Sequence, residues 1–265
     1  MGEGSLAESV EWSTATFGVI EARAGWPTIE RRQWKGVARP HLPYGRRTTD
    51  TVRALPPLPV FDPWALRAKR RLDLVLAMTL LVVASPILAV IAMAVRLTSR
   101  GPVLFRQERV GADGKTFVIL KFRTMAADMQ DRLRSDPVLW EQYVANDFKL
   151  PAASCSFTPI GNLLRKTSLD ELPQLFNVVK GEMSLVGVRP LLAEELARRP
   201  IISQCLYAEF APGMTGLWQV MGRSTVQHVA RVELDDRYVE TWSLRNDVSI
   251  LVRTVRAVLS PGHSC

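Results

Sequence analysis

The chain has 265 residues, enough for one well-packed core with an extension or for two small domains. Hydrophobic residues make up 47% of the chain and charged residues 23%, a composition that excludes an intrinsically disordered protein. The net charge of +8 indicates an anionic partner. Nucleic acid, an anionic membrane surface and phosphorylated substrates are all anionic partners of this kind.

The few cysteines give no sign of a disulfide scaffold or a metal knot. They are scattered, without a Cys-x-x-Cys pair, at Cys155, Cys205 and Cys265. This usage favours a reducing cytosolic setting. The N-terminus has acidic residues and no early apolar run, so we expect no secretory signal peptide.

Residues 1–65 are predicted to be an irregular leader. Six prolines between Arg39 and Pro63 interrupt any helix there. We assign this segment no chemistry. A regulatory or partner-binding role is the alternative interpretation.

The run from Leu74 to Val95 is uncharged over about 22 residues, long enough to cross a bilayer. Ser85 and Pro86 lie at its middle, where a proline removes a backbone donor and favours a kink. Basic residues flank both ends, which favours placing both ends on the cytoplasmic side. A helix that enters, breaks at Ser85-Pro86 and returns satisfies both observations. An ordinary kinked transmembrane helix is the alternative.

A β-hairpin is predicted after the apolar run. Residues 103–110 and 116–125 read as strands on either side of the turn-forming residues 111–114. Residues 126–148 are expected to be helical except at Pro137, and residues 149–160 to form a loop. Two more helices are predicted at about 228–242 and 247–259. The last has an apolar stripe that either packs in the core or lies on a membrane.

The acidic pair Asp170-Glu171 is the strongest candidate for chemistry. If Asp170 caps a helix running from Glu171 to Val179, the pair needs no functional explanation, because acids favour a helix N-terminus. Basic residues nearby, including Arg165 and Arg189, favour phosphate binding instead. One carboxylate could then attack phosphorus while the other holds a divalent metal.

Other chemistries find little support. The three histidines are isolated, and the chain has no phosphate-binding P-loop, dinucleotide-binding glycine motif or serine nucleophile elbow. Aromatic residues do not alternate with a basic strand as in RNA-binding proteins, so we expect no nucleic-acid partner.

Ordered sequence blocks across about residues 66–259 resemble the bacterial sugar transferases, also called monotopic phosphoglycosyl transferases. These blocks are Lys69 to Asp73 before the apolar run with Ser85-Pro86, Gly101-Pro102 to Gly111, Lys121 to Met125, Arg165 to Gln174, Lys180 to Gly187, Pro212 to Val220, and Leu234-Asp235 to Ser243. Two departures stand out: Val188 replaces a usual proline, and Ala211 stands where a basic residue is common.

The resemblance implies an α+β, mainly helical fold. It would have a leader (1–65), a re-entrant helix-break-helix in the membrane (66–100) and a small cytoplasmic catalytic domain (101–265) that contains the β-hairpin and interfacial helices. It also implies a location at the cytoplasmic face of the bacterial inner membrane. Membrane lipids are expected partners, and a homodimer is an open option.

The reaction implied by the resemblance transfers a sugar-1-phosphate from a UDP-sugar to polyprenyl (undecaprenyl) phosphate. Asp170 would be the nucleophile that carries the phosphosugar, with release of UMP, and Glu171 would bind Mg²⁺. The implied substrate-binding residues are Lys121, Arg123, Arg165, Arg189 and Asp235. The products usually begin exopolysaccharide, capsule or O-antigen repeat units. The alternatives are an inactive membrane-anchored scaffold and a membrane-tethered nucleic-acid-binding protein.

Overall fold

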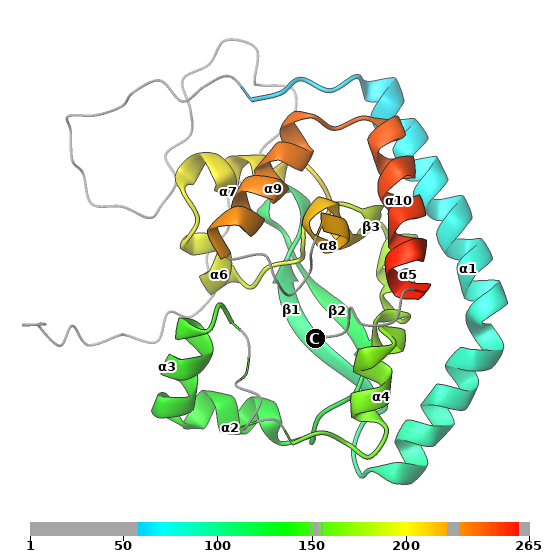
Figure 1. Ribbon diagram of the computed structural model, residues 1–265, viewed down its shortest axis with the longest axis vertical. Helices are drawn as coiled ribbons and strands as arrows, with labels where there is room; N and C mark the ends of the chain where they lie inside the picture. The colour runs from blue at the N-terminus through cyan, green and yellow to red at the C-terminus, as the bar shows by residue number, and fades with distance from the viewer. Residues whose placement is uncertain (1–57, 149, 151–153, 155, 222–227, 260–265) are drawn as a thin grey trace, which may run out of the picture.

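The computed structural model describes residues 58–148, 150, 154, 156–221 and 228–259 (Figure 1). Most of the predicted leader lies outside these residues. The described elements, in chain order, are α1 (Pro63–Thr98), β1 (Leu104–Val110), η1 (Ala112–Gly114), β2 (Thr116–Phe122), α2 (Met129–Ser135), α3 (Pro137–Ala145), α4 (Gly161–Lys166), η3 (Leu169–Glu171), α5 (Gln174–Lys180), β3 (Ser184–Val186), α6 (Ala193–Ala197), α7 (Ile201–Ala208), β4 (Gly213–Thr215), α8 (Leu217–Met221), α9 (His228–Glu240) and α10 (Leu244–Leu259). The mainly helical α+β class is confirmed.

Helix α1 is one continuous helix of 36 residues and is long and apolar enough to cross a membrane. It begins where the Asp62 carboxylate accepts a hydrogen bond from the Trp64 amide, with Pro63 in the first turn. Pro86 lies inside the helix, and the Ser85 hydroxyl bonds back to the Val82 carbonyl. The structure does not divide the helix at this point, so the re-entrant course stays a prediction.

One stripe of α1 packs against the rest of the protein, and the opposite face is apolar and exposed. The buried residues recur on one side of the helix, at Lys69, Asp73, Ala77, Ile91 and Val95. The exposed side includes Val75, Val82, Val83, Val90, Met93 and Leu97, each at least 60% exposed. Figure 1 shows α1 along one side of the molecule, from end to end. The buried residues lie both before and after Pro86, so both halves of α1 pack against the rest of the protein.

The predicted hairpin is confirmed. Strands β1 and β2 pair antiparallel, from Leu104 opposite Phe122 to Val110 opposite Thr116. The turn needs left-handed backbone at Asp113 and Gly114, with φ of 55° and 70°, which glycine and aspartate tolerate well. Phe117 and Ile119 point from β2 into the main core, where they meet Leu175 and Val178 of α5.

A second, short pair of parallel strands was not predicted. Strands β3 and β4 pair from Ser184 opposite Gly213 to Val186 opposite Thr215. A side chain on Gly213 would overlap the backbone of Gly187, and one on Gly216 would overlap the Gly187 carbonyl. These glycines therefore let the segments after β3 and around β4 approach closely.

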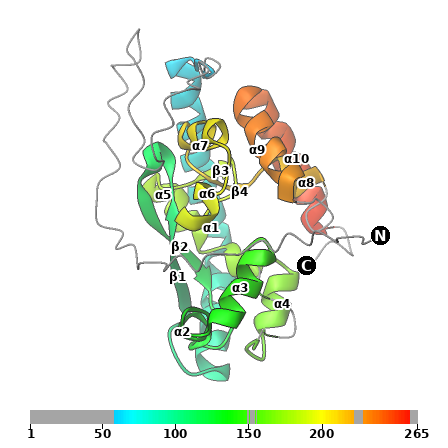
Figure 2. The same ribbon diagram turned by 90° about the vertical axis from the view of Figure 1, so that its left-hand side faces the viewer.

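Helices α2 and α3 build a smaller core of their own, around Met129, Leu133, Leu139, Tyr143 and Phe148. Pro137 separates the two helices, as the sequence predicted, because it starts α3. The Asp136 carboxylate caps α3 by accepting from the Val138 and Leu139 amides at 3.0 and 3.1 Å. In the rotated view these two helices lie low on the molecule (Figure 2).

The two predicted C-terminal helices are present as α9 and α10. The apolar residues of α10 divide between the two alternatives, since one packs in the core and others are exposed. Ile250 is 3% exposed and joins the main core, whereas Val248, Val252 and Val255 are 49, 65 and 60% exposed. A second apolar surface therefore accompanies the exposed face of α1.

Candidate active site

Asp170 and Glu171 lie in the short 3-10 turn η3, between α4 and α5. Ser168 precedes the turn with a left-handed φ of 56°. The helix expected from Glu171 to Val179 begins later, at Gln174, so the alternative interpretation in which Asp170 caps that helix does not hold. The reason is the backbone reversal at Ser168, after which the chain makes a 3-10 turn before it becomes α-helical.

The Asp170 carboxyl is buried and electrostatically unusual. The residue is 8% exposed. Burial and the neighbouring Glu171 raise the pKa of Asp170 to about 6, while Lys121 and Arg165 act in the opposite direction. A carboxylate that loses its hydration in this way is a better nucleophile than one on an open surface, and perturbed acids of this kind concentrate at functional sites.

Lys121 of β2 reaches across to Glu171. Its Nζ lies 2.6 Å from Glu171 Oε1, and the two side chains are 28% and 38% exposed. The hairpin and the η3 turn, separated by about 50 residues in the sequence, therefore contribute to one site. The Lys121 charge keeps the two adjacent carboxylates from repelling an incoming phosphate as strongly as they otherwise would.

Arg165 approaches the same site from the last turn of α4. Its guanidinium lies 5.4 Å from the ring centre of Phe157, and its charge lowers the pKa of Asp170. The structure thus brings four predicted residues together: Asp170, Glu171, Lys121 and Arg165.

Arg189 and Asp235 lie in a second cationic cluster that includes Trp218. The guanidinium of Arg189 lies 5.9 Å from the indole ring of Trp218. Asp235 is 3% exposed and makes an ion pair with Arg199 at 2.7 Å. Burial raises the pKa of Asp235 to about 6, and the Arg199 charge opposes this shift. The Asp235 carboxylate is therefore bound by the Arg199 guanidinium inside the protein.

Sequence reasoning missed Arg199 and Trp218 as members of this cluster. Arg199 lies 36 residues from Asp235, and no motif marks the pair. Arg109 of β1 also belongs here, since burial and the neighbouring Arg189 lower its pKa. The close approach of Gly187 and Gly213 brings Arg189 and Trp218 together, and that approach could not be read from spacing.

Arg123 of the hairpin is buried next to the C-terminal end of α1. It is 3% exposed, and its guanidinium donates to the carbonyls of Ser99 and Arg100 and to the Ser99 hydroxyl. Both carbonyls belong to the two residues that directly follow α1. The structure thus places the Arg123 guanidinium against the segment that follows α1, and its role in substrate binding stays a prediction.

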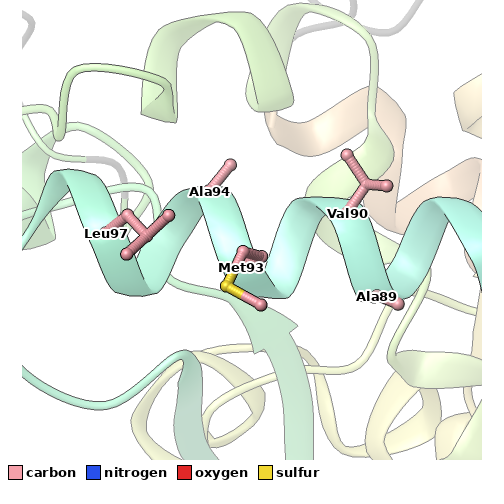
Figure 3. A pocket seen from close by; sticks show the side chains of 5 residues that line it. All are labelled: Ala89, Val90, Met93, Ala94 and Leu97. Atoms are coloured by element: carbon pink, nitrogen blue, oxygen red, sulfur yellow. The ribbon is translucent and has the colours of Figure 1, made fainter.

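An apolar hollow of about 470 Å³ lies on the second half of α1, apart from the acidic turn. Its walls are the α1 residues Ala89, Val90, Met93, Ala94 and Leu97 (Figure 3). No polar side chain lines it. The hollow therefore belongs to the apolar exterior of α1.

The residues at η3 fit a magnesium ion bound jointly by protein and substrate. The described residues contain no group of three or more histidine, cysteine or acidic side chains that would form a complete protein cage. Mg²⁺ is commonly held by one or two carboxylates together with substrate phosphates, however. The partly exposed Glu171 carboxylate, next to Asp170, would supply such a donor.

Comparison with known proteins identifies the family of the chain. The sequence profile described as "Bacterial sugar transferase" matches residues 64–261. The chain belongs to the bacterial sugar transferase family. All elements from α1 to α10 lie within the matched residues, apart from Pro63 at the start of α1.

Three relatives illustrate the similarity. The undecaprenyl-phosphate galactose phosphotransferase of Salmonella typhimurium is 44% identical over 199 residues, which are 72% of this chain and 40% of that protein. The UDP-glucose:undecaprenyl-phosphate glucose-1-phosphate transferase of Klebsiella pneumoniae is 39% identical over 218 residues, 78% of this chain and 44% of that protein. The exopolysaccharide production protein ExoY of Sinorhizobium fredii is 37% identical over 195 residues, 72% of this chain and 85% of that protein. The chain thus spans about two fifths of several sugar transferases and most of ExoY.

Proposed function

We propose that this sugar transferase is an enzyme that moves a sugar-1-phosphate from a UDP-sugar to polyprenyl phosphate. The observation that carries the proposal is the buried Asp170 carboxyl beside the Lys121–Glu171 ion pair, in a protein with an exposed apolar helix. The printed names of the relatives support it, because they include galactose and glucose-1-phosphate transferases that act on undecaprenyl phosphate.

In the first step, an Asp170 carboxylate oxygen attacks the β-phosphorus of the UDP-sugar. The bond between this phosphorus and the oxygen that bridges to the α-phosphate breaks, and UMP leaves with that oxygen and its electron pair. The product is a phosphosugar joined to Asp170 through an acyl phosphate bond. The partial burial of Asp170 supports this role, because a weakly hydrated carboxylate attacks more readily.

In the second step, an oxygen of polyprenyl phosphate attacks the same phosphorus and releases Asp170. The lipid then carries a diphosphate-linked sugar. Arg165 is positioned to bind a phosphate group near Asp170, since its charge already acts on that carboxyl. Arg189 of the second cationic cluster is assigned to the donor nucleotide.

Glu171, with substrate phosphate oxygens, would hold Mg²⁺, which neutralises charge that builds on those oxygens. Lys121 balances the charge of Glu171 and lies within reach of the same phosphates. Between them, these two residues keep anionic substrates close to an anionic nucleophile.

The cellular setting proposed for the enzyme is the cytoplasmic face of the bacterial inner membrane. The exposed apolar face of α1 supports membrane attachment, and the basic residues at both ends of its apolar run support the cytoplasmic side. The re-entrant course of α1 and formation of a homodimer belong to the same proposal. The sugar-linked lipid would begin repeat units of exopolysaccharide, capsule or O-antigen.

Neither departure from the family pattern favours an inactive scaffold. Val188 is 1% exposed and packs in the main core, and its carbonyl accepts a hydrogen bond from the Gly213 amide at 2.7 Å. The carbonyl of Ala211 lies beside Gly187, at the same junction. Both positions thus serve the packing between β3 and β4.

The test is to incubate purified full-length protein in detergent with magnesium, undecaprenyl phosphate and a panel of UDP-sugars that includes UDP-galactose and UDP-glucose. We expect UMP release with one or more sugars, and loss of release in Asp170→Asn, which keeps the size of the side chain. Mass spectrometry of protein given the donor alone should detect a phosphosugar on Asp170. Full turnover by Asp170→Asn would contradict the covalent mechanism.

A further inference from the structure

Asn177 is a completely buried polar residue in α5 that no step of the proposed reaction uses. It has no exposed surface, and its side-chain amide is fully hydrogen-bonded. Its Nδ2 donates to the Val118 carbonyl at 2.7 Å and to Glu182 Oε2 at 2.6 Å, and its Oδ1 accepts from the Leu120 amide at 3.1 Å. Losing the side chain would leave three partly buried groups without these hydrogen bonds.

Two of these bonds join α5 to the edge of β2 that faces away from β1. The Val118 carbonyl and the Leu120 amide belong to alternate residues, so they point to the same side of the strand. The Asn177 amide pairs with both, as the peptide group of a third strand would. The side chain thus fixes the position of β2 along the axis of α5 as well as the distance between the two elements.

The two elements joined by Asn177 carry the two members of the Lys121–Glu171 ion pair. Lys121 directly follows Leu120 on β2, and Glu171 lies in the η3 turn just before α5. A slip of β2 along α5 by one residue would move Lys121 by about 3.3 Å and turn its side chain to the other face of the hairpin. The 2.6 Å contact between Lys121 and Glu171 would then be lost.

We propose that Asn177 is a positioning residue that holds Lys121 against Glu171 and thereby shapes the acidic site. It acts through β2 and touches neither substrate nor the reacting carboxyl. The proposal rests on the function proposed above only for its effect on turnover, since the positioning of the ion pair is a property of the protein alone.

The first test measures the ion pair without any activity. Purified full-length protein is treated with limiting acetic anhydride, and the acetylation of Lys121 is compared by mass spectrometry with that of Lys115. Lys115 lies in the hairpin turn with a side chain 71% exposed, against 28% for Lys121. We expect Asn177→Ala to raise the labelling of Lys121 relative to Lys115 at least threefold, as Glu171→Gln should.

Ser184→Ala is the matched control. Ser184 is also buried and polar, but its hydroxyl donates to Asp73 of α1 and makes no hydrogen bond to the hairpin. Its removal should lower the melting temperature without changing the labelling ratio. If Asn177→Ala does not accumulate, Asn177→Asp keeps the size of the side chain and replaces both donors with acceptors. An unchanged ratio in a folded Asn177 variant would overturn the proposal.

The second test is a double-mutant cycle on turnover. Asn177→Ala should lower kcat by about 10- to 100-fold, the range expected when a catalytic group is displaced by an ångström or so, and change KM much less. In a Lys121→Met background the same substitution should cost less than threefold, whereas Ser184→Ala should have the same effect in both backgrounds. Equal effects of Asn177→Ala in both backgrounds would contradict a role through Lys121. If wild-type protein released no UMP while the labelling ratio still responded, the proposed reaction would fail and the positioning role would stand.

Discussion

The ammonium of Lys69 lies 2.6 Å from the carboxylate of Asp247, and both side chains are almost fully buried. This bond joins α1 to α10, two elements separated by 178 positions in the sequence. Lys69 also donates to the Val186 carbonyl of β3, while Trp242 and Tyr238 donate to Asp247. The first turns of the apolar helix are therefore part of the interior of the catalytic body.

Lys69→Met should consequently destabilise the whole protein. The substitution keeps most of the side-chain volume but leaves the Asp247 carboxylate buried without its cation, a loss of about 3 to 5 kcal/mol. Thermal unfolding in detergent, followed by circular dichroism, should show a melting temperature lower by roughly 10 °C. Lys115→Met, at an exposed position, is the control and should melt within about a degree or two of wild type. A normal melting temperature for Lys69→Met would show that α1 is attached independently of this pair.

The pKa of Asp170 predicts a pH dependence for the first chemical step. The attacking form is the carboxylate, and the pKa is raised to about 6, so kcat/KM should be constant above that pH and fall about tenfold per unit below it. Lys121 lowers the pKa of Asp170, and Lys121→Met should therefore move the acidic limb to higher pH as well as reduce the plateau. The measurement is the initial rate of phosphosugar formation between pH 5 and 8. An acidic limb at the same pH in the variant would contradict the electrostatic link between the two residues.

The Arg199–Asp235 ion pair predicts a stability effect distinct from any effect on chemistry. Asp235→Asn leaves the Arg199 guanidinium buried without a counter-charge and should cost about 3 to 5 kcal/mol. The double variant Arg199→Met with Asp235→Leu should melt above either single variant, because it leaves no lone charge behind. The measurement is thermal unfolding of Asp235→Asn, Arg199→Met, Asp235→Leu and the double variant, beside wild type. If Asp235→Asn kept the wild-type melting temperature and lost turnover, Asp235 would be a substrate contact as the family resemblance implied.

The elements that the sequence predicted correctly are those marked by local chemistry. The hairpin follows from turn residues between two β-rich runs, α3 begins at Pro137, and α5 ends at Gly181, whose φ of 87° is left-handed. Each of these signals acts over a few residues, so it can be read without knowledge of the rest of the chain.

The features that were missed or misread depend on contacts between distant segments. The three-residue strands β3 and β4 are too short for any periodicity, and their pairing rests on glycines about 26 positions apart. Asp170 was open to interpretation as a helix cap because the left-handed residue before the turn is Ser168 and not a glycine, so the turn had no signal in the sequence. The Asp-Glu pair, Lys121 and Arg165 could be selected from sequence. The roles of Asn177 and Arg199 became visible only when the structure showed that they bind β2 and Asp235.

The exposed valines of α10 predict that this helix contributes to membrane attachment. Val252 and Val255 are 65 and 60% exposed, and their side of the helix also carries Val248. Val252→Asp or Val255→Asp should weaken the recovery of the protein with anionic liposomes in flotation, because each places a charge where apolar surface would meet lipid.

The matched control for α10 is Val138→Asp on α3. Val138 is 63% exposed, so it differs from the α10 valines in location and not in exposure. Its substitution should leave flotation unchanged if only the faces of α1 and α10 meet the bilayer. The α10 variants should keep the wild-type melting temperature in detergent, which separates loss of lipid contact from loss of fold. Equal flotation of all three variants would show that α1 alone provides the attachment.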